Sequence, residues 1–447
     1  MRTFLRSKSI GVGAIGLMLV LGVLAVPAGT AAANASQLTF WVNNSVTPVA
    51  DGGTSCTQAG FTSVQAAVNA AEGLAKATIL ICPGTYAEQV QITGRANLTI
   101  RAAKPKVGAT LALPATPVAS TTPCDTAPGT GAYQPDQDGF AVCGTHKTTV
   151  TVIGITFDEA WPSGTCNDSL YGILVGGGDT LKLQNSAIVA GGAVPINGCQ
   201  GGIGIQIGMA WTTPNETGHA SVSNTSISGY QKNGVTVDGK GSTATFFQDT
   251  VTGAGPTTQT AQNGIQVSNG AYAKIQRSTI SGNECNNSTC GLNALTDYQA
   301  AGVLFYGAAK GSVITGSTVS KNDIGMYYAA SQATLPTSPD VSATFSKFIL
   351  NRDEGVLFDQ GRASLSDDNI NRSNVGIMFV QYKGQLYGDH ATVTRVRINN
   401  NSVAAIQVLS DKASSGDLPG AATFTGCAIF GAILGNASNY KLTFKQH

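Results

Sequence analysis

Apolar and polar positions follow one short pattern along most of the chain. The pattern is clearest in Ser221–Asp238, which reads SVSNTSISGYQKNGVTVD. Two apolar anchors, Val222 and Ile227, lie five residues apart, and a polar turn follows them. After a glycine, Val235 and Val237 share one face of a strand because alternate residues of a strand point the same way. The pattern predicts short strands separated by tight turns.

The paired anchors recur from Val150 onwards. The pairs are Val150/Ile155, Leu183/Ile188, Val222/Ile227, Phe246/Val251, Ile275/Ile280, Ile314/Val319, Leu365/Ile370, Val393/Ile398 and Phe424/Ile429. Phe345 and Ile349 form a deviating pair, four residues apart. Such a repeat is typical of stacked parallel coils, which bury their inner faces only against one another. Propeller blades are the alternative, but these repeats vary in length by whole loops. We therefore expect an all-β parallel β-helix of about 10–11 coils.

A short amphipathic helix is predicted near the start of the repeat region. Its apolar residues have helical spacing, and Thr62 with Gln65 fits a capping box; the apolar positions are Val64, Ala67, Val68 and Ala71. The segment SVQAAVNAA … ILICPGTYAEQVQI … NLTI resembles the opening of pectinesterases and of the broader pectin-lyase-like, right-handed parallel β-helix proteins. In that family the helix caps the first coil. The resemblance implies a right-handed β-helix with an N-terminal capping helix.

Residues 1–35 have the pattern of an export signal. A basic start, Arg2 to Lys8, precedes the apolar run Ile10–Val26 and small residues that suit cleavage. A membrane anchor is the alternative, but the run is short for a membrane span and interrupted by glycine. The remaining chain is expected to be one β-helix domain, with a capping helix and first coil at 36–102, an inserted loop at 103–148 and repeat coils at 149–447.

Composition and charge exclude several classes of protein. The chain has 447 residues, 42% of them hydrophobic, which excludes a disordered polymer. Removing Arg2, Arg6 and Lys8 leaves 26 − 3 = 23 basic residues against 25 acidic ones, so nothing suggests nucleic-acid binding. The four histidines have no metal-ligand spacing, and no cofactor or metal is indicated, although Ca²⁺ stays open. We expect a secreted protein with no membrane span after signal cleavage.

Nine cysteines in an exported chain suggest disulfides. The expected pairs are Cys56/Cys82, Cys124/Cys143, Cys166/Cys199 and Cys285/Cys290. Cys427 would be left over.

An apolar strip is predicted on the outer face of the last strand of several coils. Its members face outward in successive repeats and are Leu304, Tyr327, Leu357 and Met378. An exposed apolar strip is usually covered. One interpretation is an inserted loop, such as Ala329–Val341 or Gln381–His390. The other is a ligand, with Tyr327 as its stacking platform.

The turns before these strands are rich in charge. Asp323 and Asp353 both lie two residues before a glycine, so they should stack in adjacent coils. Close carboxylates raise one pKa, which suits acid–base catalysis or a cation site. Arg352 and Arg372 could bind a sugar carboxylate. Further binding candidates nearby are Tyr327, Glu354 and Asp359. The alternative is a solvated ladder of paired charges.

The catalytic motifs of pectinesterases, polygalacturonases and alginate epimerases are absent from the sequence. Two functional hypotheses therefore stay open. One is a secreted lyase, hydrolase or esterase that acts on an acidic extracellular polysaccharide, with Asp323 and Asp353 as acid and base. The other is a non-catalytic β-helix that binds cell-surface glycan or has a structural role. The sequence does not distinguish oligomeric states.

Overall fold

The structure is a computed structural model. It describes residues 38–94, 97–105, 107–125, 137–144, 147–162, 169–212, 216–286, 290, 299–330, 340–381, 388–410, 420–435 and 440–446. The chain divides into two units, Met1–Ser36 and Gln37–His447. The first unit lies outside the described residues, so the export signal stays a prediction.

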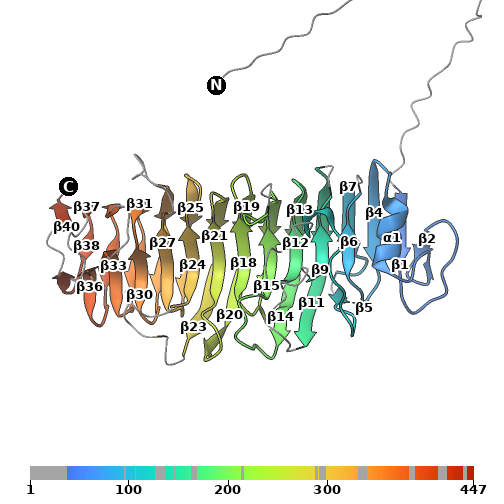
Figure 1. Cartoon of the computed structure of the whole chain (residues 1–447), viewed down its shortest axis with the longest axis horizontal. Helices are drawn as coiled ribbons and strands as arrows, with labels where there is room; N and C mark the ends of the chain where they lie inside the picture. Colours follow the sequence, from blue (N-terminus) through green and yellow to red (C-terminus); the bar gives the residue numbers. More distant parts are fainter. Residues whose placement is uncertain are drawn as a thin grey trace, which may run out of the picture. The chain divides into compact units, whose positions relative to one another are not determined.

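Successive coils contribute one strand to each of three parallel sheets (Figure 1). The first sheet contains β1(Leu38–Val42), β4(Lys76–Ile81), β7(Asn97–Ala102), β10(Thr149–Ile153), β13(Thr180–Gln184), β16(His219–Ser223), β19(Thr243–Phe247), β22(Tyr272–Gln276), β25(Ser312–Thr315), β28(Val341–Thr344), β31(Gly361–Ser366), β34(Asp389–Thr394), β37(Gly420–Thr425) and β40(Tyr440–Lys445). A small antiparallel pair, β2(Gly53–Ser55) and β3(Gln58–Ala59), lies outside the three sheets.

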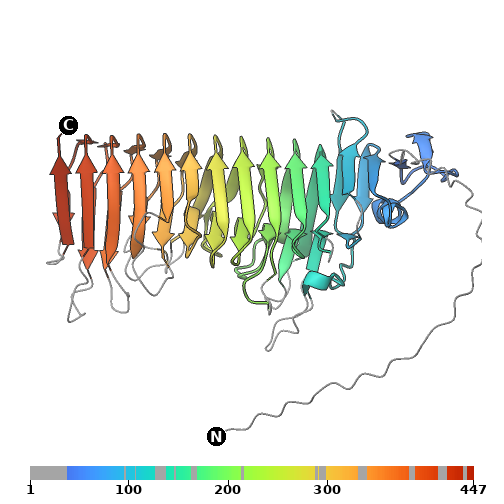
Figure 2. The same ribbon diagram turned by 90° about the horizontal axis from the view of Figure 1, so that it is seen from above.

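The second sheet contains β5(Gly84–Ala87), β8(Ala109–Ala112), β11(Ile155–Pro162), β14(Ala187–Val194), β17(Ser226–Ile227), β20(Thr250–Thr257), β23(Thr279–Cys285), β26(Thr318–Ser320), β29(Lys347–Ile349), β32(Asn369–Asn371), β35(Arg397–Asn399) and β38(Ala428–Ile429). The third sheet contains β6(Val90–Ile92), β9(Gln137–Val142), β12(Leu170–Val175), β15(Ile203–Ile207), β18(Asn233–Asp238), β21(Asn263–Ser268), β24(Ala301–Tyr306), β27(Ile324–Ala329), β30(Glu354–Phe358), β33(Val375–Gln381), β36(Ala404–Ser410) and β39(Ile433–Gly435). Figure 2 shows the strands of successive coils side by side.

The alternation expected from the sequence is confirmed in Ser221–Asp238. Val222, Ile227, Val235 and Val237 all belong to one continuous core, which runs between the three sheets. Each coil completes the burial of its neighbour, because the core residues of one coil pack on the same positions of the next.

Phe345 is not a core anchor. The inward positions of that coil are Ala343, which pairs with Ile314 and Leu365, and Phe348. Phe345 instead occupies the turn between β28 and β29 with φ 52° and is 66% exposed. The five-residue spacing of anchors therefore holds in this coil too, with a small anchor in place of a large one.

Residues 103–148 form more than an inserted loop. They contribute β8 and β9, which pair with strands of the coils on both sides. Together with β7 they complete a coil, so the stack has 12 complete coils where about 10–11 were expected. This coil was missed because its β8 and β9 do not repeat the paired-anchor spacing.

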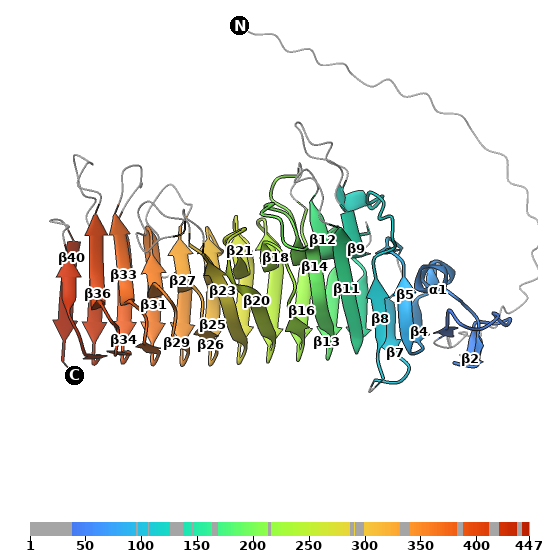
Figure 3. The same ribbon diagram turned by 90° about the horizontal axis from the view of Figure 1, so that it is seen from below.

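The predicted helix is present as α1(Val64–Ala71) and buries the expected apolar residues. It lies beside β4 near the first strands of the sheets (Figure 3). Its N-cap is Ser63, whose hydroxyl accepts the Ala66 N–H, so the Thr62 capping box was wrong. The Glu88 carboxylate accepts the backbone N–H groups of Val64 and Gln65, the first two residues of the helix, at 2.7 and 2.9 Å. That the helix closes the first coil stays a prediction.

Three of the expected disulfides are present, Cys56–Cys82, Cys124–Cys143 and Cys285–Cys290. Cys199 is also disulfide-bonded, whereas its expected partner Cys166 lies outside the described residues. Cys427 is free and half-buried, as expected for the residue left over.

Phe348→Ala is expected to destabilise the protein by about 3–5 kcal/mol, because it leaves a cavity in the continuous core. Phe345→Ala, three residues earlier in the same coil, should change stability by less than about 0.5 kcal/mol because that ring is exposed. Chemical denaturation of both variants measures the difference. Equal losses would contradict the placement of these two rings.

Candidate functional site

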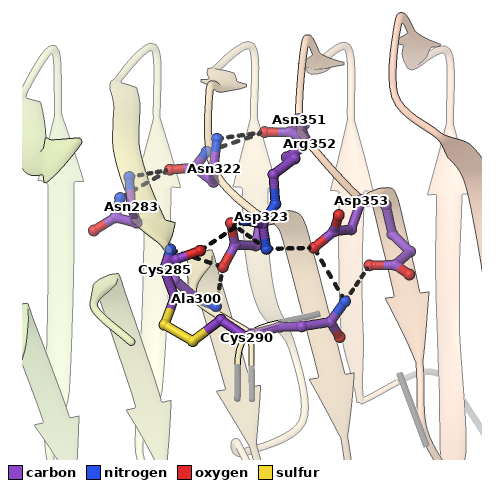
Figure 4. Close-up of polar contacts among 11 residues, drawn as sticks. Asn283, Cys285, Cys290, Ala300, Asn322, Asp323, Asn351, Arg352 and Asp353 are labelled. Carbon is purple, nitrogen blue, oxygen red and sulfur yellow. Dashed lines mark hydrogen bonds and ion pairs between the residues drawn. A yellow bond between two sulfur atoms is a disulfide. The ribbon is translucent and has the colours of Figure 1, made fainter. Parts of the chain in front are cut away.

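The charged turns meet in a compact cluster before β27 and β30 (Figure 4). A ladder of buried asparagines fixes these turns, because each side chain bonds to the next coil. The Asn283 amide donates to Asn322 Oδ1 at 2.9 Å, and the Asn322 amide donates to Asn351 Oδ1 at 3.1 Å. Asp323 directly follows Asn322, and Asp353 follows Asn351 after one intervening residue, Arg352. In these adjacent coils the Asp353 N–H donates to the Asp323 carbonyl at 2.9 Å.

Asp323 holds the two ends of the segment that contains the Cys285–Cys290 disulfide. Its Oδ2 accepts the backbone N–H of Cys285 at 3.0 Å and that of Ala300 at 2.8 Å. The side chain is fully buried. Burial raises the pKa of Asp323 to about 7, although both amides and Arg352 oppose the shift.

Arg352 joins the two aspartates. Its Nη2 lies 3.3 Å from Asp323 Oδ1 and 3.1 Å from Asp353 Oδ2, and its Nη1 donates to the Cys285 carbonyl at 2.7 Å. About a third of the side chain is exposed. The guanidinium thus compensates two carboxylates and ties them to the disulfide-closed segment.

Glu354 is a third buried acid in the cluster. The Gln299 amide donates to Asp353 Oδ2 at 3.3 Å and to Glu354 Oε2 at 3.2 Å. Burial, and then the negative charge of Asp353, raises the pKa of Glu354 well above its usual value. Gln299 was not found from the sequence, since nothing in its local pattern marks it as a partner of residues more than fifty positions away.

The cluster therefore brings together Asp323, Asp353, Glu354 and Arg352. The glycine-relative positions predicted the adjacency of Asp323 and Asp353. All three acids are at most 1% exposed. From within the cluster, the Asp323 carboxylate bonds its turn to both ends of the disulfide-closed segment. A catalytic role for Asp323 and Asp353 stays a prediction, because direct attack on a substrate would need an accessible carboxylate.

Arg372 does not join Arg352. It occupies the left-handed turn position that Lys321 and Leu350 occupy in the preceding coils, with φ 57°. Arg352 is an additional residue after Asn351 and folds over the acids instead. A two-pronged contact by both arginines with one carboxylate is thus not supported, because Arg372 occupies a different position of the turn and is exposed.

Tyr327 and Asp359 form a separate pair on the third sheet. The Tyr327 hydroxyl donates to Asp359 Oδ2 at 2.8 Å. The apolar strip next to them is mostly covered, since Leu357 and Met378 are 2% and 3% exposed in a second apolar cluster. Most of the two loops proposed as covers, residues 331–339 and 382–387, lies outside the described residues.

The outer face of the third sheet has an accessible region around Tyr306, which we call the tyrosine patch. Gln266, Leu304 and Tyr327 are aligned in three neighbouring strands, and each is partly exposed. Tyr306, two residues beyond Leu304 on the same face, is 51% exposed. Thr236 on one side and Leu357 on the other are buried. The sequence indicates that Tyr306 faces outward, because it follows the inward-facing Phe305 in the same strand.

No group of three or more His, Cys, Asp or Glu side chains in the described part of the chain could hold a metal ion. Among those same residues, no helix is long and apolar enough to cross a membrane.

Stability should fall as pH rises from about 4 to about 7, because burial raises the pKa of Asp323, Asp249 and Asp368 to about 7. Unfolded carboxyls ionise near 4, so in this window the folded state holds more protons. The thermal midpoint should be lower at about pH 7.5 than at about pH 5. Asp323→Asn keeps a side-chain oxygen that can accept the N–H groups of Cys285 and Ala300, and it should reduce this drop in the thermal midpoint.

Asp51→Asn, at an exposed position, serves as the control and should leave the drop unchanged. Differential scanning calorimetry across the window measures both. A midpoint that rises with pH, or a full drop in Asp323→Asn, would contradict this account of the buried carboxyls.

Comparison with known proteins supports the fold. A family model described as "Right handed beta helix region" matches residues 212–389. The A-module of the mannuronan C-5 epimerase AlgE4 from Azotobacter vinelandii is similar, with a TM-score of 0.52 and 11% identity over 85% of this chain and 94% of that one. The catalytic domain of Agl-KA is similar with a TM-score of 0.59 and 15% identity over 85% of this chain and 64% of that one.

A search of curated proteins finds no significant match. The similar structures share too little sequence to indicate more than the fold. Their architecture, the matched repeat region and the three parallel sheets agree with one another. The chain therefore has the parallel β-helix fold, and its residues 212–389 match the right-handed β-helix family model.

Proposed function

We propose that this protein is secreted and binds an extracellular polysaccharide at the tyrosine patch. The observation that carries the proposal is the exposure of Tyr306, 51%, on a sheet face whose neighbouring positions are otherwise buried or half-buried. An exposed tyrosine beside a second one is a surface on which the apolar face of a sugar ring can stack. The similar AlgE4 A-module is named for an epimerase of mannuronan, so this fold is compatible with a polysaccharide ligand.

The patch has the mixture of groups that glycan binding needs. Leu304 and the two tyrosine rings supply apolar area, while the Gln266 amide can bond to sugar hydroxyls. Neighbouring strands are about 4.8 Å apart, so Gln266, Leu304 and Tyr327 follow one another along the stack. A linear glycan that runs across the strands would contact each in turn.

The disulfides support an oxidising location for the protein. Three described pairs are bonded, and such bonds persist mainly in exported proteins. An exported protein meets glycans outside the cell. Secretion can be tested directly by sequencing the N-terminus of the mature protein, which should start close to residue 36.

Tyr306→Ala should weaken glycan binding about tenfold, because a central aromatic contact is lost. Tyr272→Ala on the first sheet is the matched control and should bind like the unmodified protein. Binding is measured by affinity electrophoresis against a panel of uronate-containing and neutral glycans. Unchanged binding in Tyr306→Ala, for every glycan that binds the unmodified protein, would exclude the patch.

We propose acid–base turnover of a glycan at the cluster of Asp323, Asp353 and Arg352 as a second candidate function. The observation that favours it is the adjacency of Asp323 and Asp353, which both contact the partly exposed Arg352. Burial raises the pKa of Asp323 to about 7, and a catalytic acid or base works best when its pKa is near the working pH. Arg352 beside it would stabilise negative charge that develops on a substrate.

Asp353→Asn should lower turnover at least about 100-fold if this second function is right, because general acid–base groups typically contribute 10²–10⁴. The assay follows new reducing ends and unsaturated products from the same glycan panel. Asp51→Asn controls for a change of charge. Full activity in Asp353→Asn would remove this residue from the mechanism, and binding without any product would leave the non-catalytic function.

A further inference from the structure

In the coils formed by residues 312–400, the acidic side chains are mostly buried and the basic side chains are mostly exposed. Seven of the eight acidic residues in this segment are buried, namely Asp323, Asp340, Asp353, Glu354, Asp359, Asp368 and Asp389. The eighth, Asp367, is already paired with Arg395 through two bonds of 2.6 and 2.7 Å. The basic residues Lys321, Lys347, Arg372 and Arg397 are exposed. The described surface of these coils is therefore basic, although the chain is nearly neutral.

The four exposed cations lie in two rows, one on the outer face of the second sheet and one in the turn that follows its strands. Lys347 and Arg397 lie in one row across β29, β32 and β35, separated by Asn369. Lys321 and Arg372 lie in the adjoining turn, separated by Leu350. Each of the four coils thus contributes one cation, and adjacent coils are about 4.8 Å apart. None of the four forms an ion pair with a described residue.

An exposed aromatic ring lies beside this row. Phe345 precedes Lys347 in the same coil, is 66% exposed, and adopts a left-handed conformation with φ 52°. Bulky residues are rarely found there, and a strained residue on a surface is a reason to look for function. Corresponding turns of the next two coils have Asp367 and Arg395 in the same conformation, so the aromatic residue is particular to the Lys347 coil.

We propose that the outer face of β26, β29, β32 and β35 binds a linear acidic polysaccharide that runs along the stack of coils. Lys321, Lys347, Arg372 and Arg397 would each meet one anionic group. Within each row the two cations are two coils apart, and the two rows alternate from coil to coil, so a polyuronate that runs along the stack meets one cation in every coil. Phe345 provides a ring that stacks on a sugar face.

This surface is distinct from the tyrosine patch, which lies on the third sheet. It also explains Arg372, which has no contact with the cluster of buried acids. The polar positions between the cations support the same ligand. Thr318, Asn369 and Asn371 face outward beside them and can bond to sugar hydroxyls. Burial raises the pKa of Asp323 and Asp368 to about 7, so these two carboxyls carry less than a full negative charge at neutral pH.

The test compares the unmodified protein with the double variant Lys347→Gln/Arg372→Gln. Polygalacturonate is the probe, a neutral glucan and single-stranded DNA are the comparisons, and binding is measured by isothermal titration calorimetry over a series of salt concentrations. Lys182→Gln removes an exposed cation from the first sheet and is the matched control.

Binding of polygalacturonate should weaken about tenfold in the double variant at low salt, since each exposed charge contact contributes modestly. The difference should shrink as salt rises, and the neutral glucan should bind both proteins equally. Phe345→Ala should weaken binding without changing its salt dependence. Thermal melting of each variant confirms that it is folded, and exposed substitutions of this kind are expected to melt like the unmodified protein.

The proposal is overturned if the double variant binds polygalacturonate as the unmodified protein does, or if Lys182→Gln weakens binding equally. Single-stranded DNA that binds as tightly as polygalacturonate would show a general polyanion surface instead. Tyr306→Ala should retain the salt-dependent binding of polygalacturonate. A variant that abolishes binding at one surface therefore leaves binding at the other surface measurable. The two proposals can be rejected independently.

Discussion

The structure depends on parallel backbone pairing between successive coils. A single coil has an inner face that only its neighbours can bury, so no coil is stable by itself. The pairing also fixes the register of side chains. Residues at the same place in neighbouring coils lie about 4.8 Å apart, whether they are asparagines in a buried ladder, carboxylates in a cluster or cations on a surface. Each feature of the site is a consequence of that register.

The fold could be predicted because the inward residues repeat. Alternation around the glycines placed Val235, Val303 and Val356 in the core, and the structure agrees. The prediction of the fold failed in two places, each for a physical reason. The coil formed by β7, β8 and β9 lacks the paired anchors, so its strands could not be recognised locally. Phe345 was taken for an anchor because it is large, yet Ala343 fills the core there, since coil packing sets the size that fits.

The candidate site could be predicted only in part. The positions of Asp323 and Asp353 relative to their glycines correctly indicated that the two turns adjoin. Their burial could not be foreseen, because it depends on Gln299 and on the disulfide-closed segment, whose register relative to these turns is set by tertiary contacts. Arg352 and Arg372 look equivalent in sequence. One extra residue in the Arg352 turn sends the two side chains to different surroundings.

The disulfides described here have a mechanical consequence. They join residues separated by 26, 19 and 5 positions, so each closes a local segment. None of these bonds connects distant coils, and tension along the chain is therefore carried by strand pairing once the local segments are taut. A protein built in this way should lengthen in steps under load, as coils detach one after another. The coil that contains the exposed residues 430–435 is the natural place for such peeling to begin.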